Sequence, residues 1–231
     1  MSKEKQSGDL ELMSITAMVI EMSVAAEDML SAAVRGLTLQ LTDTCQNVID
    51  RDAVVDGLEV SLEAACVKMM GRHNDKTLDI RSISNIIKNA SDLERIADYS
   101  VDIARIGQRM ADEAIYKPLI DVPRYATVAY GMIHDSVDAY LSHDTELAAQ
   151  VIKRDDTADL YYAQMRVTLI QILQQDTHSV MQATYLLQVA HFLERICDHC
   201  TNIAERTTHL GTAPNRGKNT TESISCGAFL A

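Results

Sequence analysis

Hydrophobic side chains recur along most of this chain at steps of three and four residues, the spacing of one buried face of an α-helix. The clearest stretch is the first, with apolar positions at Leu12, Ile15, Val19, Met22, Ala26, Met29, Ala33 and Leu37. Only three Pro and nine Gly interrupt the 231 residues, so composition also favours long helices. The sequence predicts an all-α protein.

Breaks in this pattern divide the predicted helices into two groups of three. In the first group the breaks fall near 42–47 and 71–75. Pro118 and Pro123 mark the boundary between the groups, because proline disrupts a helix interior. We expect the later helices at 124–141, 144–175 and 177–210. The predicted organisation is a disordered N-terminus at 1–9, a three-helix bundle over 10–113, a linker at 114–123, a second three-helix bundle over 124–210 and a disordered tail at 211–231.

The two groups share a duplicated motif. The segment Leu93-Glu94-Arg95-Ile96 returns one hundred residues later as Leu193-Glu194-Arg195-Ile196, and the matches continue through an aspartate, an isoleucine and an alanine. A weaker match pairs Arg51-Asp52-x-x-x-Asp56 with Arg154-Asp155-x-x-x-Asp159. Both matches fall at corresponding places in the two groups, which predicts two tandem, pseudo-symmetric three-helix bundles.

Charge and composition exclude several classes of function. The formal net charge of −12 argues against nucleic-acid binding, which needs clustered Lys and Arg. The apolar runs are too short to insert into a membrane. Five cysteines without a repeating framework are typical of reduced thiols and favour the cytoplasm. The chain shows neither a glycine-rich phosphate loop nor a metalloprotease or catalytic-triad pattern, so we expect no enzymatic activity and assign no catalytic residue.

Acidic residues four apart form a stripe on a helix in each repeat. Because one residue turns the helix by about 100°, Glu94, Asp98 and Asp102 lie about 140–180° from the apolar seam and should face outward. Each preceding helix adds an Asp-x-x-x-Asp pair that an antiparallel neighbour would bring close. The candidate metal ligands are Asp52, Asp56, Glu94, Asp98, Asp102, Asp155, Asp159, Glu194, Asp198 and Asn202.

These stripes have two readings from the residues alone. The first is a solvated helix face, since acidic pairs four apart are common. The second is a metal site, because like charges at this spacing weaken a helix by about 0.2–0.5 kcal/mol per pair and no lysine is interleaved to neutralise them. Oxygen ligands of this kind favour iron, Mn²⁺ or Mg²⁺ over Ca²⁺ and Zn²⁺.

The duplicated Leu-Glu-Arg-Ile-x-Asp segments and the upstream acidic pairs resemble the PhoU family over residues 10–210. This resemblance implies a non-catalytic regulator of phosphate uptake and of the phosphate regulon, with metal clusters at the protein surface. It further implies two partners: the ATPase of a phosphate ABC transporter and a sensor histidine kinase. His199 stands where the first repeat has Tyr99, and Asn202 stands where it has Asp102, so the two sites need not have equal affinity.

Two other functions remain open from the sequence. One is a carboxylate-bridged metal-binding or metal-storage helical protein unrelated to phosphate signalling, although the expected Glu-x-x-His motif is missing. The other is a purely structural bundle whose acidic faces give solubility. A homodimer is the expected assembly in either case.

Overall fold

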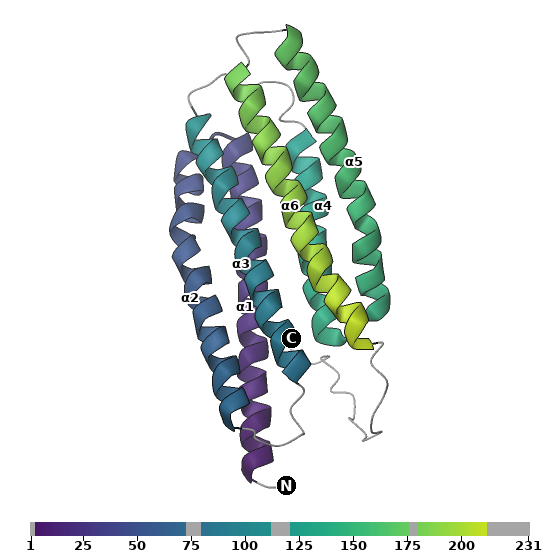
Figure 1. The fold of residues 1–231 in the computed structure, drawn as a ribbon. Coiled ribbons are helices and arrows are strands. Elements are labelled where there is room, and N and C mark those ends of the chain that lie inside the picture. The colour runs from purple at the N-terminus through teal and green to yellow at the C-terminus, as the bar shows by residue number, and fades with distance from the viewer. Residues whose placement is uncertain (1–2, 73–79, 112–120, 176–179, 212–231) are drawn as a thin grey trace, which may run out of the picture.

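The protein is described from a computed structural model, which covers residues 3–72, 80–111, 121–175 and 180–211. These described residues form six helices and no strand, which confirms the predicted all-α class (Figure 1). The helices are α1 (Lys3–Thr38), α2 (Thr42–Arg72), α3 (Ile80–Arg109), α4 (Asp121–Ser142), α5 (Thr145–Gln175) and α6 (Val180–Gly211).

The helices pack as two three-helix bundles that lie side by side. Helices α1, α2 and α3 run alternately up and down and contact one another, and α4, α5 and α6 repeat this arrangement (Figure 1). The bundles meet along two seams, α3 against α6 and α1 against α4, while α2 and α5 form the outer flanks. The acidic stripes on α3 and α6 therefore lie beside their own flanking helices and also near the seam between the bundles.

Apolar side chains from all six helices fill the core. The largest fully buried ones include Met22, Met29, Leu93, Ile96 and Tyr125. The four cysteines in the described residues are free and buried, so they act as small packing groups. No helix in the described parts of the chain has the length and apolar character that a membrane span requires.

The turn after the first helix of each bundle is also duplicated. Gln40 and His143 both adopt a left-handed backbone, with φ of 52° and 56°. At each of them the helix ends with the same backbone hydrogen bond between residues five apart: the amide of Leu41 donates to the Gly36 carbonyl and the amide of Asp144 to the Ala139 carbonyl, both at 2.9 Å. The repeat therefore extends to backbone geometry that the sequence motifs do not show.

Two helices begin earlier in the chain than the sequence predicted. Helix α1 begins at Lys3, inside the 1–9 segment that was expected to be disordered, because lysine, glutamate and glutamine have high helix propensity. Helix α4 begins at Asp121, inside the expected 114–123 linker. Pro123 fits there because the first turn of a helix needs no backbone N–H donor from it.

The start of α5 lies within one residue of the predicted position, 144. Asp144 caps α5, since its Oδ1 accepts hydrogen bonds from the amides of Glu146 and Leu147, each at 2.9 Å. Most of the predicted turn at 71–75 and the predicted tail beyond Gly211 lie outside the described residues.

Candidate functional site

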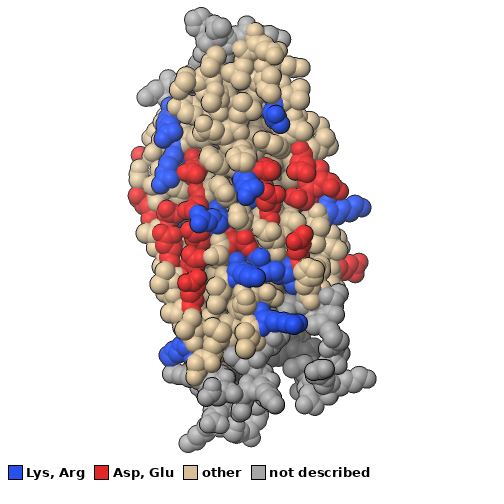
Figure 2. All heavy atoms as spheres, viewed as in Figure 1, with Lys and Arg blue, Asp and Glu red and all other residues tan. Residues whose placement is uncertain are grey.

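The acidic stripes of α3 and α6 lie next to the aspartate pairs of α2 and α5. We call Asp52, Asp56, Glu94, Asp98 and Asp102 the first carboxylate cluster, and Asp155, Asp159, Glu194 and Asp198 the second carboxylate cluster. Figure 2 shows acidic side chains gathered over α2 and α3 on one side of this face and over α5 and α6 on the other, with arginine and lysine between them. Each bundle thus brings carboxylates from two helices together.

In the first carboxylate cluster the side chains act on one another electrostatically. Burial and the charge of Asp98 raise the pKa of Glu94 to about 7, against the lowering effect of Arg95. Burial and then the charges of Asp56 and Asp98 raise the pKa of Asp52. The charge of Asp98 on α3 therefore affects the carboxyl group of Asp52 on α2, so the acidic residues of these two helices are close enough to interact.

The second carboxylate cluster repeats this behaviour. Burial raises the pKa of Asp155 to about 6, with further contributions from Asp198 and Asp159. Burial, followed by the charge of Asp198, also raises the pKa of Glu194. Asn202, the last predicted ligand, is exposed about one turn farther along α6. The structure thus couples four of the five predicted residues of this repeat.

Arginines neutralise part of both stripes, which the sequence interpretation missed. Arg95 Nη1 lies 3.0 Å from Asp98 Oδ2, and Arg105 Nη1 lies 3.0 Å from Asp102 Oδ1. Arg195 and Asp198 form the same pair in the second repeat, also at 3.0 Å. The expectation that the stripes lack a counterion was therefore wrong, because arginine three residues away reaches the carboxylate that a lysine four residues away would have met.

As the side chains stand, none of the described His, Cys, Asp and Glu residues forms a group of three around a common point that would hold a metal ion. The donor set nevertheless suits a hard cation. Glu94 and Glu194 are only 18% and 22% exposed, and the buried Glu194 Oε2 lies 3.2 Å from His191 Nδ1. Crowded, half-buried carboxylates with raised pKa values are stabilised by added positive charge.

A buried phenol near the second carboxylate cluster carries an unsatisfied hydroxyl group. The Tyr125 hydroxyl is fully buried without a hydrogen-bond partner, and its ring stacks on Tyr161 at 5.7 Å between centroids. Burial and the charges of Cys197 and Glu194 raise its pKa far above the ordinary range. An unpaired buried hydroxyl costs about 1–3 kcal/mol, so this position also fits a partner that the protein chain does not supply.

A polar cluster between the bundles was not predicted from the sequence. We call Asn89, Asp92, His199 and Arg206 the inter-bundle polar cluster. His199 Nδ1 donates to Asp92 Oδ1 at 2.7 Å, Arg206 forms an ion pair with Asp92, and Arg206 Nε donates to Asn89 Oδ1 at 2.8 Å. Asn89 is 1% exposed and Asp92 is 9% exposed, so these contacts are shielded from water.

The pseudo-symmetric counterpart of this contact is aromatic. Tyr99 stacks on Phe192 with ring centroids 5.8 Å apart, at the positions that correspond to His199 and Asp92. The polar contact of His199 with Asp92 and the aromatic contact of Tyr99 with Phe192 are neighbours on the α3/α6 seam, since the rings of Tyr99 and His199 lie 5.8 Å apart. The sequence does contain a signal for these contacts, namely the mismatches between the two copies of the duplicated motif. Asp92 aligns with Phe192, and Tyr99 aligns with His199.

Comparisons with known proteins agree with both the fold and the repeat. The family model described as the PhoU domain matches residues 19–107 and 122–207, once in each bundle. The chain is 33% identical over 185 residues to a phosphate-specific transport system accessory protein PhoU homolog of Aquifex aeolicus, covering 80% of this chain and 84% of that protein. It is 28% identical to the phosphate-specific transport system accessory protein PhoU of Escherichia coli K12, over 84% of this chain and 81% of that protein.

A solved structure shows the same architecture. The crystal structure of PhoU from Pseudomonas aeruginosa superposes with a TM-score of 0.85 at 26% identity, and the match covers 88% of this chain and 98% of that one. Because both bundles match the family model and a relative above 30% identity is covered over most of its length, the chain belongs to the PhoU family.

Proposed function

We propose that this protein is a non-catalytic accessory regulator of phosphate transport. The observation that carries this proposal is the PhoU domain match in both bundles, together with relatives named as accessory proteins of a phosphate-specific transport system. The absence of a predicted catalytic constellation in the sequence fits a protein that acts by binding. We place it in the cytoplasm, as a homodimer, where the transporter ATPase and a sensor kinase would be accessible.

The partners we propose are the ATPase of the phosphate ABC transporter and the sensor histidine kinase of the phosphate regulon. If the proposal is correct, the purified protein binds at least one of these two partners, and the affinity differs between phosphate-rich and phosphate-poor conditions. Binding is measured with the purified ATPase and the cytosolic part of the kinase. Failure to bind either of them under both conditions would contradict the proposed function.

We further propose that the two carboxylate clusters hold hard cations such as iron, Mn²⁺ or Mg²⁺. The crowded carboxylates and the buried Tyr125 hydroxyl, which has no hydrogen-bond partner among the described residues, support this proposal. The holding residues would be Asp52, Asp56, Glu94 and Asp98 in the first repeat and their counterparts in the second. A bound cation would supply positive charge at the surface and so change which partner surfaces the clusters attract.

Elemental analysis tests the metal proposal directly. We expect the protein purified without chelator to carry iron, manganese or magnesium in stoichiometric amounts. We expect the variant with Glu94, Asp98, Glu194 and Asp198 all changed to alanine to carry none, because half of the proposed ligands in each cluster are gone. Circular dichroism of the variant checks that its helices are retained. Equal metal content in the folded variant and the parent protein would refute this assignment, whereas redox turnover by the loaded protein would favour the metal-storage alternative.

A further inference from the structure

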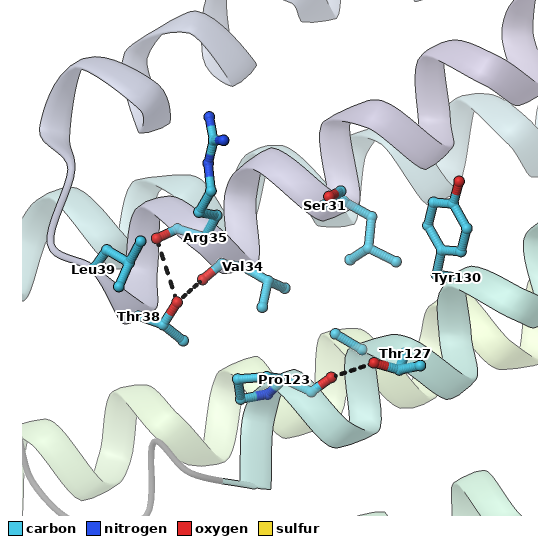
Figure 3. Close-up of a pocket in the computed structure, with 10 residues that line it drawn as sticks. Ser31, Val34, Arg35, Thr38, Leu39, Pro123, Thr127 and Tyr130 are labelled. Atoms are coloured by element: carbon cyan, nitrogen blue, oxygen red, sulfur yellow. Dashed lines mark hydrogen bonds between the residues drawn. The ribbon is translucent and has the colours of Figure 1, made fainter.

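Tyr125 lies in the second turn of α4 and points into the second bundle. On the other side of α4, Pro123, Thr127 and Tyr130 line a groove of about 440 Å³ between α4 and α1 (Figure 3). At about 100° per residue, Tyr125 lies about 140–160° around the helix from these three residues. Its side chain is therefore directed away from this groove and toward α5 and α6, the helices that carry the second carboxylate cluster.

The neighbours of Tyr125 place its ring at the level of this cluster. The ring stacks on Tyr161 with centroids 5.7 Å apart, and Tyr161 follows Asp159 by two residues on α5. Burial raises the pKa of the Tyr125 hydroxyl far above its ordinary range, and the charges of Cys197, Glu194 and Asp159 add to this effect. The hydroxyl therefore keeps its proton and lies within interaction range of carboxylates from both helices.

The Tyr125 hydroxyl is a donor that lacks an acceptor. The side chain is 0% exposed, and its hydroxyl has no hydrogen-bond partner among the described residues. A buried hydroxyl in this state is unfavourable until an acceptor is supplied. The oxygen atoms of an occupied cation site, whether carboxylate oxygens or bound waters, are acceptors for a protonated phenol.

The first bundle has no such donor at the corresponding place. The left-handed residues Gln40 and His143, which end the first helix of each bundle, are 103 residues apart. The same offset pairs Met22 of α1 with Tyr125 of α4, and Met22 is also 0% exposed. A thioether donates no hydrogen bond and accepts one only weakly. At this place the two bundles therefore differ in chemistry although both side chains are buried.

We propose that Tyr125 is a positioning residue of the second carboxylate cluster: when the cluster holds a hard cation, the Tyr125 hydroxyl donates a hydrogen bond to an oxygen atom bound to that cation. The oxygen belongs to a carboxylate such as Glu194 or to a water. A donor of this kind orients the ligand oxygen, and its loss lowers metal affinity about 10–100-fold. The first carboxylate cluster holds its cation without this hydrogen bond. The inference rests on the metal-binding part of the proposed function.

The test requires each cluster to be titrated separately in the full-length protein. Glu94→Ala with Asp98→Ala leaves the second carboxylate cluster intact, and Glu194→Ala with Asp198→Ala leaves the first. Each of these single-cluster variants is titrated with Mn²⁺, and electron paramagnetic resonance measures the Mn²⁺ that remains free in solution.

Tyr125→Phe is then introduced into both single-cluster variants. We expect it to weaken Mn²⁺ binding by the second carboxylate cluster about tenfold or more and to change binding by the first less than about twofold. Tyr140→Phe is the matched control, because Tyr140 is a buried tyrosine on the same helix, about 22 Å from Tyr125 at 1.5 Å per residue. We expect this control to change neither cluster.

Urea denaturation of the Tyr125→Phe protein separates positioning from packing. Phenylalanine keeps the ring and its stack on Tyr161, so with chelator the variant should be at least as stable as the parent protein, because the lost hydroxyl is unpaired. With Mn²⁺ the variant should gain less stability than the parent protein. Equal destabilisation with chelator and with Mn²⁺ would show a packing role only and would overturn the proposal.

The remaining outcomes distinguish this inference from the metal proposal on which it rests. If neither single-cluster variant binds Mn²⁺, the metal proposal fails, and the role of Tyr125 fails with it. If the second carboxylate cluster binds Mn²⁺ equally well with and without the hydroxyl, the role of Tyr125 alone is wrong. A visible phenolate-to-iron charge-transfer band on adding Fe³⁺, absent in Tyr125→Phe, would also overturn the proposal, because Tyr125 would then be a ligand itself.

Discussion

The Asp92→Ala variant is expected to lose about 3–5 kcal/mol of unfolding free energy, because it removes the acceptor that both Arg206 and His199 share. Burial lowers the pKa of Arg206 and of His199, so neither side chain is fully solvated once Asp92 is gone. An unpaired charge between the bundles is much more costly than the loss of a surface ion pair. Urea denaturation of the metal-free protein at neutral pH measures the difference.

Asp28→Ala is the control for this prediction. Asp28 also pairs with an arginine, Arg51 at 3.3 Å, but its side chain is 58% exposed, so its loss should cost no more than about 1 kcal/mol. If Asp92→Ala costs no more than Asp28→Ala, the inter-bundle polar cluster does not hold the two bundles together. A loss confined to Asp92→Ala would instead show that the inter-bundle polar cluster contributes much of the stability.

The helical pattern and the duplication were predictable from the sequence because they are encoded locally. Steps of three and four residues locate the helices, and the Leu-Glu-Arg-Ile segments locate the same helix in each bundle. The helix ends were less predictable. Pro123 looks like a helix breaker by residue type, yet within the first turn it removes no helical hydrogen bond, so α4 begins two residues before it.

The candidate site was predictable only in part, for a physical reason. Spacing fixes which side of one helix a carboxylate faces, and adjacent antiparallel helices then bring Asp52 near Asp98. The contact of Asp92 with Arg206 depends on how α3 crosses α6, which no local pattern contains. The role of Arg95 as a counterion was not predicted, because the interpretation of the stripes rested on the lack of a lysine four residues away. The longer, forked side chain of arginine reaches Asp98 from a position three residues away.

Changing Glu94 to glutamine is expected to alter the pH dependence of stability in the metal-free protein. In the folded state the pKa of Glu94 is about 7, raised by burial and by Asp98 from a value of 4.5 for the unfolded chain. The protonated form is thus favoured by folding: this stabilising contribution is present below about pH 4.5 and is lost as the pH rises through about 7. Glutamine cannot ionise, so the variant should be about 2–3 kcal/mol more stable than the parent protein at pH 8 and should lose that advantage near pH 5.

The measurement is urea denaturation with chelator at pH 5, 6, 7 and 8, reported as the difference between variant and parent protein. Taking the difference cancels the contribution of His199, which is the same in both proteins. Burial lowers the pKa of His199, so its contribution to stability has the opposite pH dependence and is lost as the pH falls below about 6.5. Glu63→Gln, an exposed change on α2 outside both clusters, controls for the loss of one surface charge. A difference for Glu94→Gln that stays constant from pH 5 to 8 would contradict the crowding of the first carboxylate cluster. Adding Mn²⁺ at pH 8 should reverse the order, because the parent protein would gain the bound cation while the variant has lost one of the charged ligands that hold it.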